Sequence, residues 1–168
     1  MRQDGGKWKE IIGWAFIEGH WLRRKYFTPR ALSTIAERIR QSEIGHSGEL
    51  MVAIEAASPS HERKTHLRAL EVFGRLRTWD TPHNTGVLLY LALDRHGIEI
   101  IADRGVAAPQ AVWETICSQL QSRFQHGDYT AGVLDAVAAI ERALASHCPP
   151  MQDGQENLND LPNEPVLL

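Results

Sequence analysis

Residues 86–103 read GVLLYLALDRHGIEIIAD and contain two runs of strand-forming residues, 86–93 and 97–103. Only the three residues DRH lie between them, so the chain must turn back and the two runs form an antiparallel hairpin. The first run is apolar without alternation, which is typical of a strand that helices cover on both faces. The hairpin therefore predicts a sheet buried between helices.

A third β-type run, ELMVAIE at residues 49–55, comes earlier in the chain and is followed by apolar residues at helical spacing. We expect Ser60 to cap this helix. The apolar face of this helix is predicted to consist of Leu67, Leu70, Val72, Phe73 and Leu76. Its solvent face is predicted to carry Arg63, Lys64, Arg68 and Arg75. Strand, helix and strand form a crossover unit, whose two strands are normally parallel.

Three more helices are expected around this unit. Thr28 and Pro29 are a cap and first-turn pair for a helix that ends near Gly45. A further helix covers residues 109–124, and another begins after the cap Asp128. The predicted fold class is α/β, with a small central mixed β-sheet of three to four strands, the hairpin included, flanked by about four helices.

The composition fits one compact domain, since 43% of the 168 residues are apolar and 23% are charged. We assign the α/β domain to residues 28–147, an aromatic and basic segment to residues 1–27, and a disordered acidic tail to residues 148–168. No apolar stretch approaches the roughly 18 residues of a membrane-spanning helix. With no signal peptide and two isolated cysteines, we expect a cytoplasmic protein, at most peripheral to a membrane.

Charge is distributed unevenly along the chain. Residues 1–40 carry nine Lys and Arg against four Asp and Glu, whereas residues 41–148 and 149–168 each have a net charge of −4. The total of −3 excludes a strongly basic nucleic-acid-binding protein. Residues 6–27 combine many aromatic residues with Arg-Arg-Lys and predict an amphipathic helix that packs on the chain's own core. The alternative is that this helix binds an anionic membrane surface or a protein partner.

The strand directions also predict a candidate site. The loops before the strands at 49–55 and 86–93 and the loop after 97–103 must lie at the same end of the sheet. Five polar residues gather there: Asp80, His83, Asn84, Asp103 and Arg104, with His46, Ser47 and Arg77 as neighbours.

Two chemistries are open at this end. Asp80, Asn84 and Asp103 offer the oxygen ligands that Ca²⁺ or Mg²⁺ prefers. A hydrolase would add His83 as catalytic acid or base and Arg104 as the catalytic residue that holds phosphate. The structural alternative is that Asp103 pairs with Arg104 or Arg77 while Asp80 caps the turn.

Three segments resemble the TPM domain family. WDTPHNTGVLL at residues 79–89 is similar to the family's tryptophan-containing loop that leads into Asn-Asn-Gly-Val-Leu-Leu, and residues 98–105 resemble its second strand and glycine turn. The third segment resembles the family's pattern before the last helix: Phe124, Gly127, Asp128, Tyr129 and Gly132. The resemblance covers roughly residues 28–147.

This resemblance implies an α/β sandwich with about four strands. Related domains have been described as thylakoid-type acid phosphatases, as calcium binders, or as proteins of membrane and photosystem maintenance. The family's acidic opening has no counterpart here, its glycine-rich turn has become residues 102–107, and His83 replaces its first asparagine. We therefore expect a binding or accessory module, with a metal-assisted phosphomonoester hydrolase or a purely structural subunit as alternatives.

Overall fold

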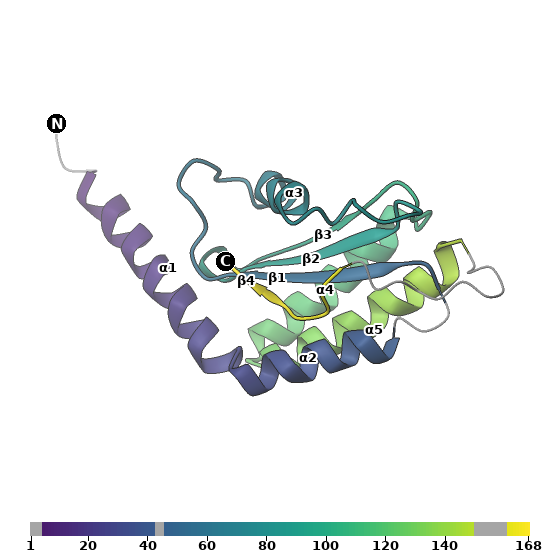
Figure 1. Cartoon of the computed structure of the whole chain (residues 1–168). Coiled ribbons are helices and arrows are strands. Elements are labelled where there is room, and N and C mark those ends of the chain that lie inside the picture. The colour runs from purple at the N-terminus through teal and green to yellow at the C-terminus, as the bar shows by residue number, and fades with distance from the viewer. Residues whose placement is uncertain (1–4, 43–45, 150–160) are drawn as a thin grey trace.

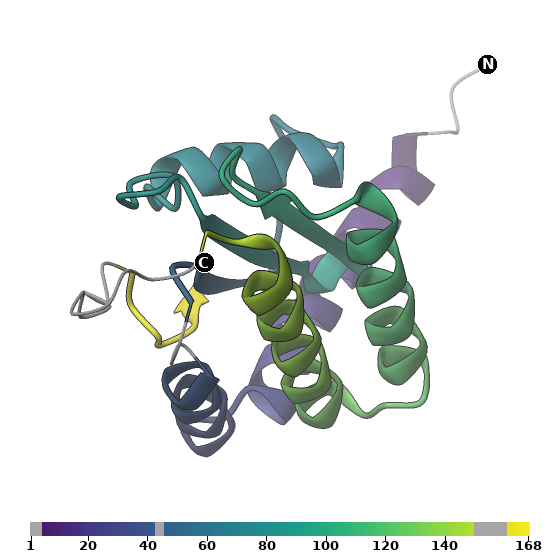
Figure 2. The same cartoon turned by 90° about the vertical axis from the view of Figure 1, so that its right-hand side faces the viewer.

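The protein is a three-layer α/β sandwich, and its computed structural model describes residues 5–42, 46–149 and 161–168 (Figures 1 and 2). A four-stranded sheet in the order β3-β2-β1-β4 forms the middle layer. The elements in chain order are α1 (Gly5–Tyr26), α2 (Pro29–Ser42), β1 (Glu49–Glu55), α3 (Thr65–Arg75), β2 (Gly86–Ala92), β3 (Gly97–Ala102), α4 (Gln110–Gln125), α5 (Tyr129–His147) and β4 (Val166–Leu167). The predicted α/β class and mixed sheet are confirmed.

The strand directions also agree with the prediction. β1 and β2 are parallel, with Glu49 opposite Gly86 and Glu55 opposite Ala92. β2 and β3 are antiparallel and joined by a short 3₁₀ turn at Leu93–Arg95. Every residue of β1 and β2 is buried, as expected for central strands covered on both faces.

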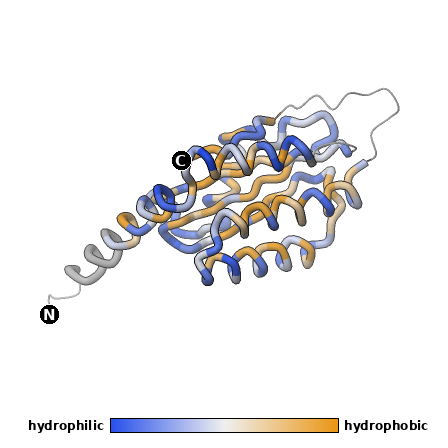
Figure 3. The backbone as a smooth tube through the Cα atoms, turned by 90° about the horizontal axis from the view of Figure 1, so that it is seen from below, coloured by the Kyte–Doolittle hydropathy of each residue, from blue (hydrophilic) through white to orange (hydrophobic). Residues whose placement is uncertain are grey.

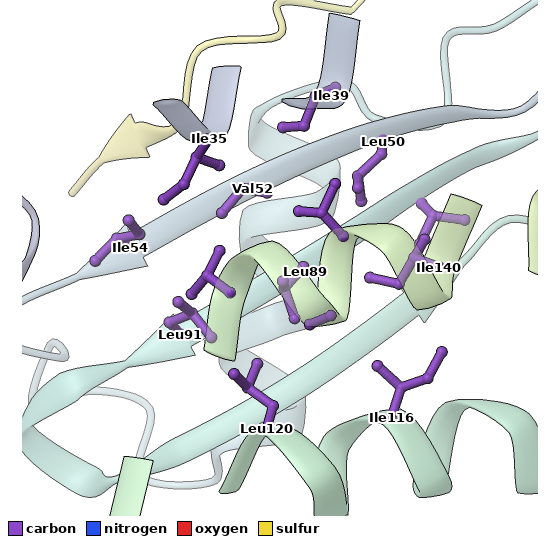
Figure 4. Close-up of a cluster of buried hydrophobic side chains, with 14 of the residues drawn as sticks. Ile35, Ile39, Leu50, Val52, Ile54, Leu89, Leu91, Ile116, Leu120 and Ile140 are labelled. Atoms are coloured by element: carbon purple, nitrogen blue, oxygen red, sulfur yellow. The ribbon is translucent and has the colours of Figure 1, made fainter. Parts of the chain in front are cut away.

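Alternate residues of the strands face two separate cores. The larger core lies between the sheet and α2, α4 and α5, and the smaller one lies beneath α3. Figure 4 shows side chains of the larger core from five elements: Ile35 and Ile39, Leu50, Val52 and Ile54, Leu89 and Leu91, Ile116 and Leu120, and Ile140. Hydrophobic residues accordingly dominate the strands when the chain is coloured by hydropathy (Figure 3).

Thr28 and Asp128 directly precede their helices as predicted, whereas Ser60 does not cap α3. The Thr28 hydroxyl accepts a hydrogen bond from the backbone N–H of Ala31 at 3.3 Å and caps α2. Asp128 precedes α5, but its carboxylate pairs with Arg123 and makes no cap bond. Ser60 lies in a loop, because α3 begins only at Thr65.

The loop before α3 is held by the turn that joins β2 to β3. Both carboxylate oxygens of Asp94 accept hydrogen bonds from Ser58, at 2.9 and 2.8 Å. The Arg95 guanidinium donates to the backbone carbonyls of Glu62 and Pro59, at 2.7 and 3.1 Å. These contacts hold the backbone of the loop away from the helical path, which explains the late start of α3.

The predicted faces of α3 also need correction. Arg68, which was expected in solvent, is buried beside the carboxylate of Glu55. Leu67 and Leu70, which were expected in the core, are each 43% exposed. Val72, Phe73 and Leu76 pack against the smaller core as predicted, and Ala69 is buried beside them. The buried face of α3 therefore overlaps the predicted one but includes Arg68 and Ala69 in place of Leu67 and Leu70.

The acidic tail is not disordered throughout. Residues 161–168 pack on the sheet, and Val166 and Leu167 form β4, which runs parallel to β1. The prediction of a disordered tail over 148–168 is therefore wrong for these residues, while 150–160 lie outside the described residues. β4 is the fourth strand that the sequence pattern left open.

α1 is helical as predicted. Its C-terminal half packs on the domain, and its N-terminal end projects outward (Figure 1). A Cβ at Gly19 would lie 1.8 Å from the Ala56 carbonyl oxygen, so glycine permits this close approach. Leu22 and Phe27 are buried in the larger core. The spacing of Trp8, Ile11, Ile12 and Ala15 predicts one shared side of the amphipathic helix. The side chains of the first three lie outside the described residues, and Ala15 is partly buried. No helix in the described residues is long and apolar enough to cross a membrane.

Candidate functional site

Three loops meet at the end of the sheet where β1 and β2 begin and β3 ends. The backbone N–H of Asp103 donates to the Gly86 carbonyl at 2.9 Å, and the N–H of Gly105 donates to the Asn84 carbonyl at 2.8 Å. The Thr85 hydroxyl donates to the Ser47 carbonyl at 2.5 Å. The loops that strand direction predicted to converge are therefore joined by hydrogen bonds.

Glycine is required at the centre of this junction. A Cβ at Gly105 would lie 2.1 Å from the carbonyl oxygen of His83 and 2.5 Å from that of Asn84. Asn84 has a φ of 54°, in the left-handed region that asparagine tolerates better than most residues. These two backbone requirements bring the loop before β2 against the loop after β3.

The side chains of Asn84, Asp103 and Arg104 lie together at this junction. The Arg104 guanidinium donates to the Asn84 amide oxygen at 3.4 Å, and the Arg104 backbone N–H donates to Asp103 Oδ1 at 2.7 Å. The other carboxylate oxygen, Asp103 Oδ2, is buried and accepts no hydrogen bond from any described residue. An unpaired buried carboxylate oxygen is energetically costly unless a ligand, ion or water satisfies it.

No described side-chain contact joins Asp80 or His83 to Asn84, Asp103 or Arg104. The Asp80 carboxylate forms an exposed ion pair with Arg77 at 2.6 Å, and the Arg77 guanidinium also lies 5.6 Å from the centre of the Trp79 ring. His83 is exposed to solvent. In the predicted structural alternative, Arg77 was a partner for Asp103, whereas in the structure it pairs with Asp80.

The described residues contain no group of three or more His, Cys, Asp or Glu side chains arranged to hold a metal ion. A cation near Asp103 would therefore have one carboxylate, the Asn84 amide oxygen, backbone carbonyls and water as ligands. Such an oxygen-only set suits Ca²⁺ or Mg²⁺ and does not suit zinc, which is usually bound by sulfur and nitrogen.

A buried histidine–glutamate contact that the sequence pattern did not predict lies at the same end of the sheet. His46 Nε2 lies 2.8 Å from Glu141 Oε2, and both side chains are buried. Burial, followed by the negative charge of Glu141, raises the pKa of the nearby Cys148 thiol to about 11. Glu141 lies between Val137 and Leu144 on the buried face of α5, and this position was the available signal. A single Glu on an apolar stripe does not identify its partner 95 residues away.

The opposite end of the sheet carries a second buried network. Arg68 on α3 donates two hydrogen bonds to the Glu55 carboxylate, at 3.0 and 2.6 Å. The Tyr90 hydroxyl donates to the same carboxylate. Burial and the bond to Glu55 raise the pKa of Tyr90, and the bond to Glu55 raises the pKa of Arg68. Each charge is paired, which favours a structural role for this network.

α1 presents the largest exposed apolar side chains near a cationic cluster. Trp14, Ile17 and Trp21 are 74%, 62% and 53% exposed and lie on one side of the helix, since they are three and four residues apart. The helix ends in Arg23, Arg24 and Lys25, and the Lys25 ammonium lies 4.5 Å from the centre of the Trp21 ring. The face opposite these residues packs on the domain through Gly19 and Leu22.

The sandwich, its crossover unit and its sheet-end loops define the class of the protein. A family model of the TPM domain matches residues 23–143, and the chain belongs to the TPM domain family. Among solved structures, the chain is similar to the BA42 protein of the psychrophilic bacterium Bizionia argentinensis, whose structure was determined by NMR. The two chains are 29% identical with a TM-score of 0.72, and the match covers 83% of this chain and 94% of that one. No curated protein matches the chain.

Proposed function

We propose that the protein is a binding module of the TPM domain family that attaches to an anionic membrane surface through the outward face of α1. The observation that carries this proposal is the exposed row Trp14, Ile17 and Trp21 beside the cationic end of the helix. Tryptophan is favoured at the interface between lipid headgroups and acyl chains, where an amphipathic ring has both apolar and polar surroundings. Each Lys or Arg close to an anionic membrane surface adds about 1 kcal/mol of attraction.

The position of α1 supports this proposal. Its inner face is occupied by the domain, so the outer face is the one available to lipid. The helix projects from the sandwich, so lipid can reach this row without contact with the sheet (Figure 1). A protein partner is the competing occupant, but the Arg-Arg-Lys cluster beside the tryptophans favours a surface that is both negatively charged and apolar.

Sedimentation with liposomes tests this proposal. We expect the protein to sediment with vesicles of phosphatidylcholine and phosphatidylserine at 50 mM salt, and to bind at least about tenfold more weakly at 500 mM salt because ions screen the attraction. The double variant Trp14→Ser/Trp21→Ser should lose most of the binding. Trp79→Ser is the matched control, because Trp79 is 46% exposed but lies in the turn after α3 rather than on α1. Failure to sediment at low salt would exclude the membrane assignment, and an α1-dependent complex in solution would favour a protein partner.

We propose that the protein also binds a divalent cation, at the loop junction that contains Asn84, Asp103 and Arg104. The supporting observation is Asp103 Oδ2, which is buried without a hydrogen bond from the described residues and lies in the same loop junction as Asn84. A bound Ca²⁺ or Mg²⁺ would compensate this oxygen. The hydrolase alternative lacks comparable support, since Asp80 is already paired with Arg77 and His83 is exposed to solvent.

A titration with CaCl₂ and with MgCl₂, followed by amide NMR shifts, tests the cation proposal. We expect saturable shifts at Asn84, Asp103 and Gly105 that disappear in Asp103→Asn. Asp128→Asn, which removes an exposed carboxylate elsewhere, should leave them unchanged. Small, unsaturable shifts over the whole chain would exclude the site. Turnover of p-nitrophenyl phosphate that depends on Asp103, His83 and Arg104 would instead support the hydrolase.

A further inference from the structure

Residues 161–168 lie along the outer edge of β1 and bind it through backbone hydrogen bonds, in the way a peptide ligand binds a sheet edge. Only Val166 and Leu167 have register partners, Ala53 and Ile54. Outside that register, the Leu168 N–H donates to the Ile54 carbonyl at 3.0 Å and the Leu168 carbonyl accepts from the Ala56 N–H at 3.4 Å. Without this segment, β1 would present the unpaired N–H and C=O groups that allow a sheet to accept another strand.

We propose that this edge of β1 is a peptide-binding site, which the chain's own segment 161–168 fills and which also accepts an extended, proline-containing apolar segment of a partner protein. The residues that match the family end at 143, so the segment lies outside the family domain whose sheet edge it covers. The sequence LPNEPVLL defines the chemistry of a suitable partner: apolar residues at both ends and two prolines between them.

A buried acidic side chain binds the first residue of the segment. Glu49 Oε2 accepts a hydrogen bond from the Leu161 N–H at 2.7 Å, and Glu49 is buried. A hydrogen bond from a backbone N–H to a buried carboxylate is charge-assisted and stronger than a neutral one. Recognition of a peptide here therefore does not depend on the short strand pairing alone.

Apolar contacts fix which side chains of a peptide point inward. Leu161 is buried in the smaller core, and Val166 and Leu168 pack against the same core together with Phe73 and Leu76 of the α3 region. Glu164, in the middle of the segment, is exposed. Pockets for some side chains and solvent for others, combined with backbone bonds, are typical of recognition by strand addition.

The two ends of the connection between α5 and the segment lie close to the start of β1. The Pro149 carbonyl accepts a hydrogen bond from the Ser47 hydroxyl at 2.8 Å, and Leu161 is bonded to Glu49 two residues further along. The chain's own segment therefore competes for the site at a high effective concentration, on the order of millimolar for a short link. A partner segment gains access when this intramolecular competition is weakened.

The test uses the full chain with a specific protease site inserted between residues 152 and 157, cut after folding. We expect the cut protein to keep its circular dichroism spectrum and to bind a fluorescein-labelled LPNEPVLL peptide in an anisotropy assay. The uncut protein should bind the same peptide at least about 100-fold more weakly because the tethered segment competes. Unfolding on cutting, or no binding of the peptide by the folded cut protein, would overturn the proposal.

Three changes test the contacts themselves. N-methylation of the peptide at the position of Leu168 removes the N–H that bonds to Ile54, and Glu49→Gln removes the charge that accepts the Leu161 N–H. Each should weaken binding about tenfold or more, whereas a peptide with Glu164→Gln should bind as well as the parent. Equal binding of the N-methylated peptide would overturn strand addition. A dimer of the uncut protein that Glu49→Gln dissociates would assign the site to a second copy of the chain and overturn the partner proposal.

Discussion

Replacement of Arg68 by Met should strongly destabilise the protein. Arg68 and Glu55 are both buried and joined by two hydrogen bonds, so the variant leaves a buried carboxylate without its cation. Removal of one partner of a buried ion pair costs about 3–5 kcal/mol. Unfolding entropy for a chain of this length is about 0.35 kcal/mol per kelvin, so we expect Tm to fall by about 9–14 °C.

Thermal and urea unfolding followed by circular dichroism measure this effect. Arg75→Met is the matched control, because Arg75 lies on the same helix but is exposed, and it should change stability by less than about 0.5 kcal/mol. The double variant Glu55→Gln/Arg68→Met removes both charges and should recover most of the loss. A loss below 1 kcal/mol in Arg68→Met, or a double variant no more stable than the single one, would refute the argument.

Three further predictions concern other parts of the fold. Gly105→Ala should be strongly destabilising in urea unfolding, because the added Cβ would clash with the carbonyl oxygens of His83 and Asn84. Gly74→Ala, at an open position of α3, should stabilise the protein by about 0.5–1 kcal/mol. Equal effects of the two substitutions would contradict the close backbone approach at Gly105. Burial raises the pKa of both Cys117 and Cys148 to about 11 from 9.0, so stability should fall between pH 9 and 11, and Cys→Ala at either position should reduce that fall; an unchanged pH profile would argue against it. Tyr129→Leu should cost about 1–3 kcal/mol in thermal unfolding, since the ring stacks between two others at 4.3 Å on each side; a smaller loss would show that stacking contributes little.

The sheet topology was accessible from the sequence because its signals are local. The three-residue connection at 94–96 leaves the chain no path except a hairpin, and the crossover between 55 and 86 fixes the parallel pair. The start of α3 was not accessible, because Ser60 is a good cap in isolation. Asp94 and Arg95, more than thirty residues further along the chain, bind the loop around Ser60 and prevent a helix from starting there.

The burial of Arg68 and the pairing of β4 have the same explanation. An arginine on an amphipathic helix is normally in solvent. The burial of Arg68 is favourable because two carboxylates pair with it, Glu55 at the end of β1 and Glu71 on the same helix. Residues 161–168 are short and contain two prolines, so their composition indicates a loop. Their order comes from a free strand edge and from Glu49, neither of which is encoded within the segment.

For the candidate site, strand direction predicted which loops meet but not which side chains pair. The backbone bonds between the loops of Asn84 and Gly105 follow from the hairpin. The ion pair between Asp80 and Arg77 forms in the turn after α3. In this turn Arg77 has a φ of 54°, which the sequence did not indicate. The buried Asp103 oxygen likewise depends on three-dimensional packing.

The pairing of β4 with β1 has a consequence for the protein during translation. Leu167 is synthesised 113 residues after its partner Ile54, which corresponds to about 6–23 s at typical elongation rates of 5–20 residues per second. During that interval the edge of β1 that β4 later covers has no strand beside it. Slower decoding downstream of α5 would lengthen the period in which the nascent chain can aggregate, without any change in the native fold.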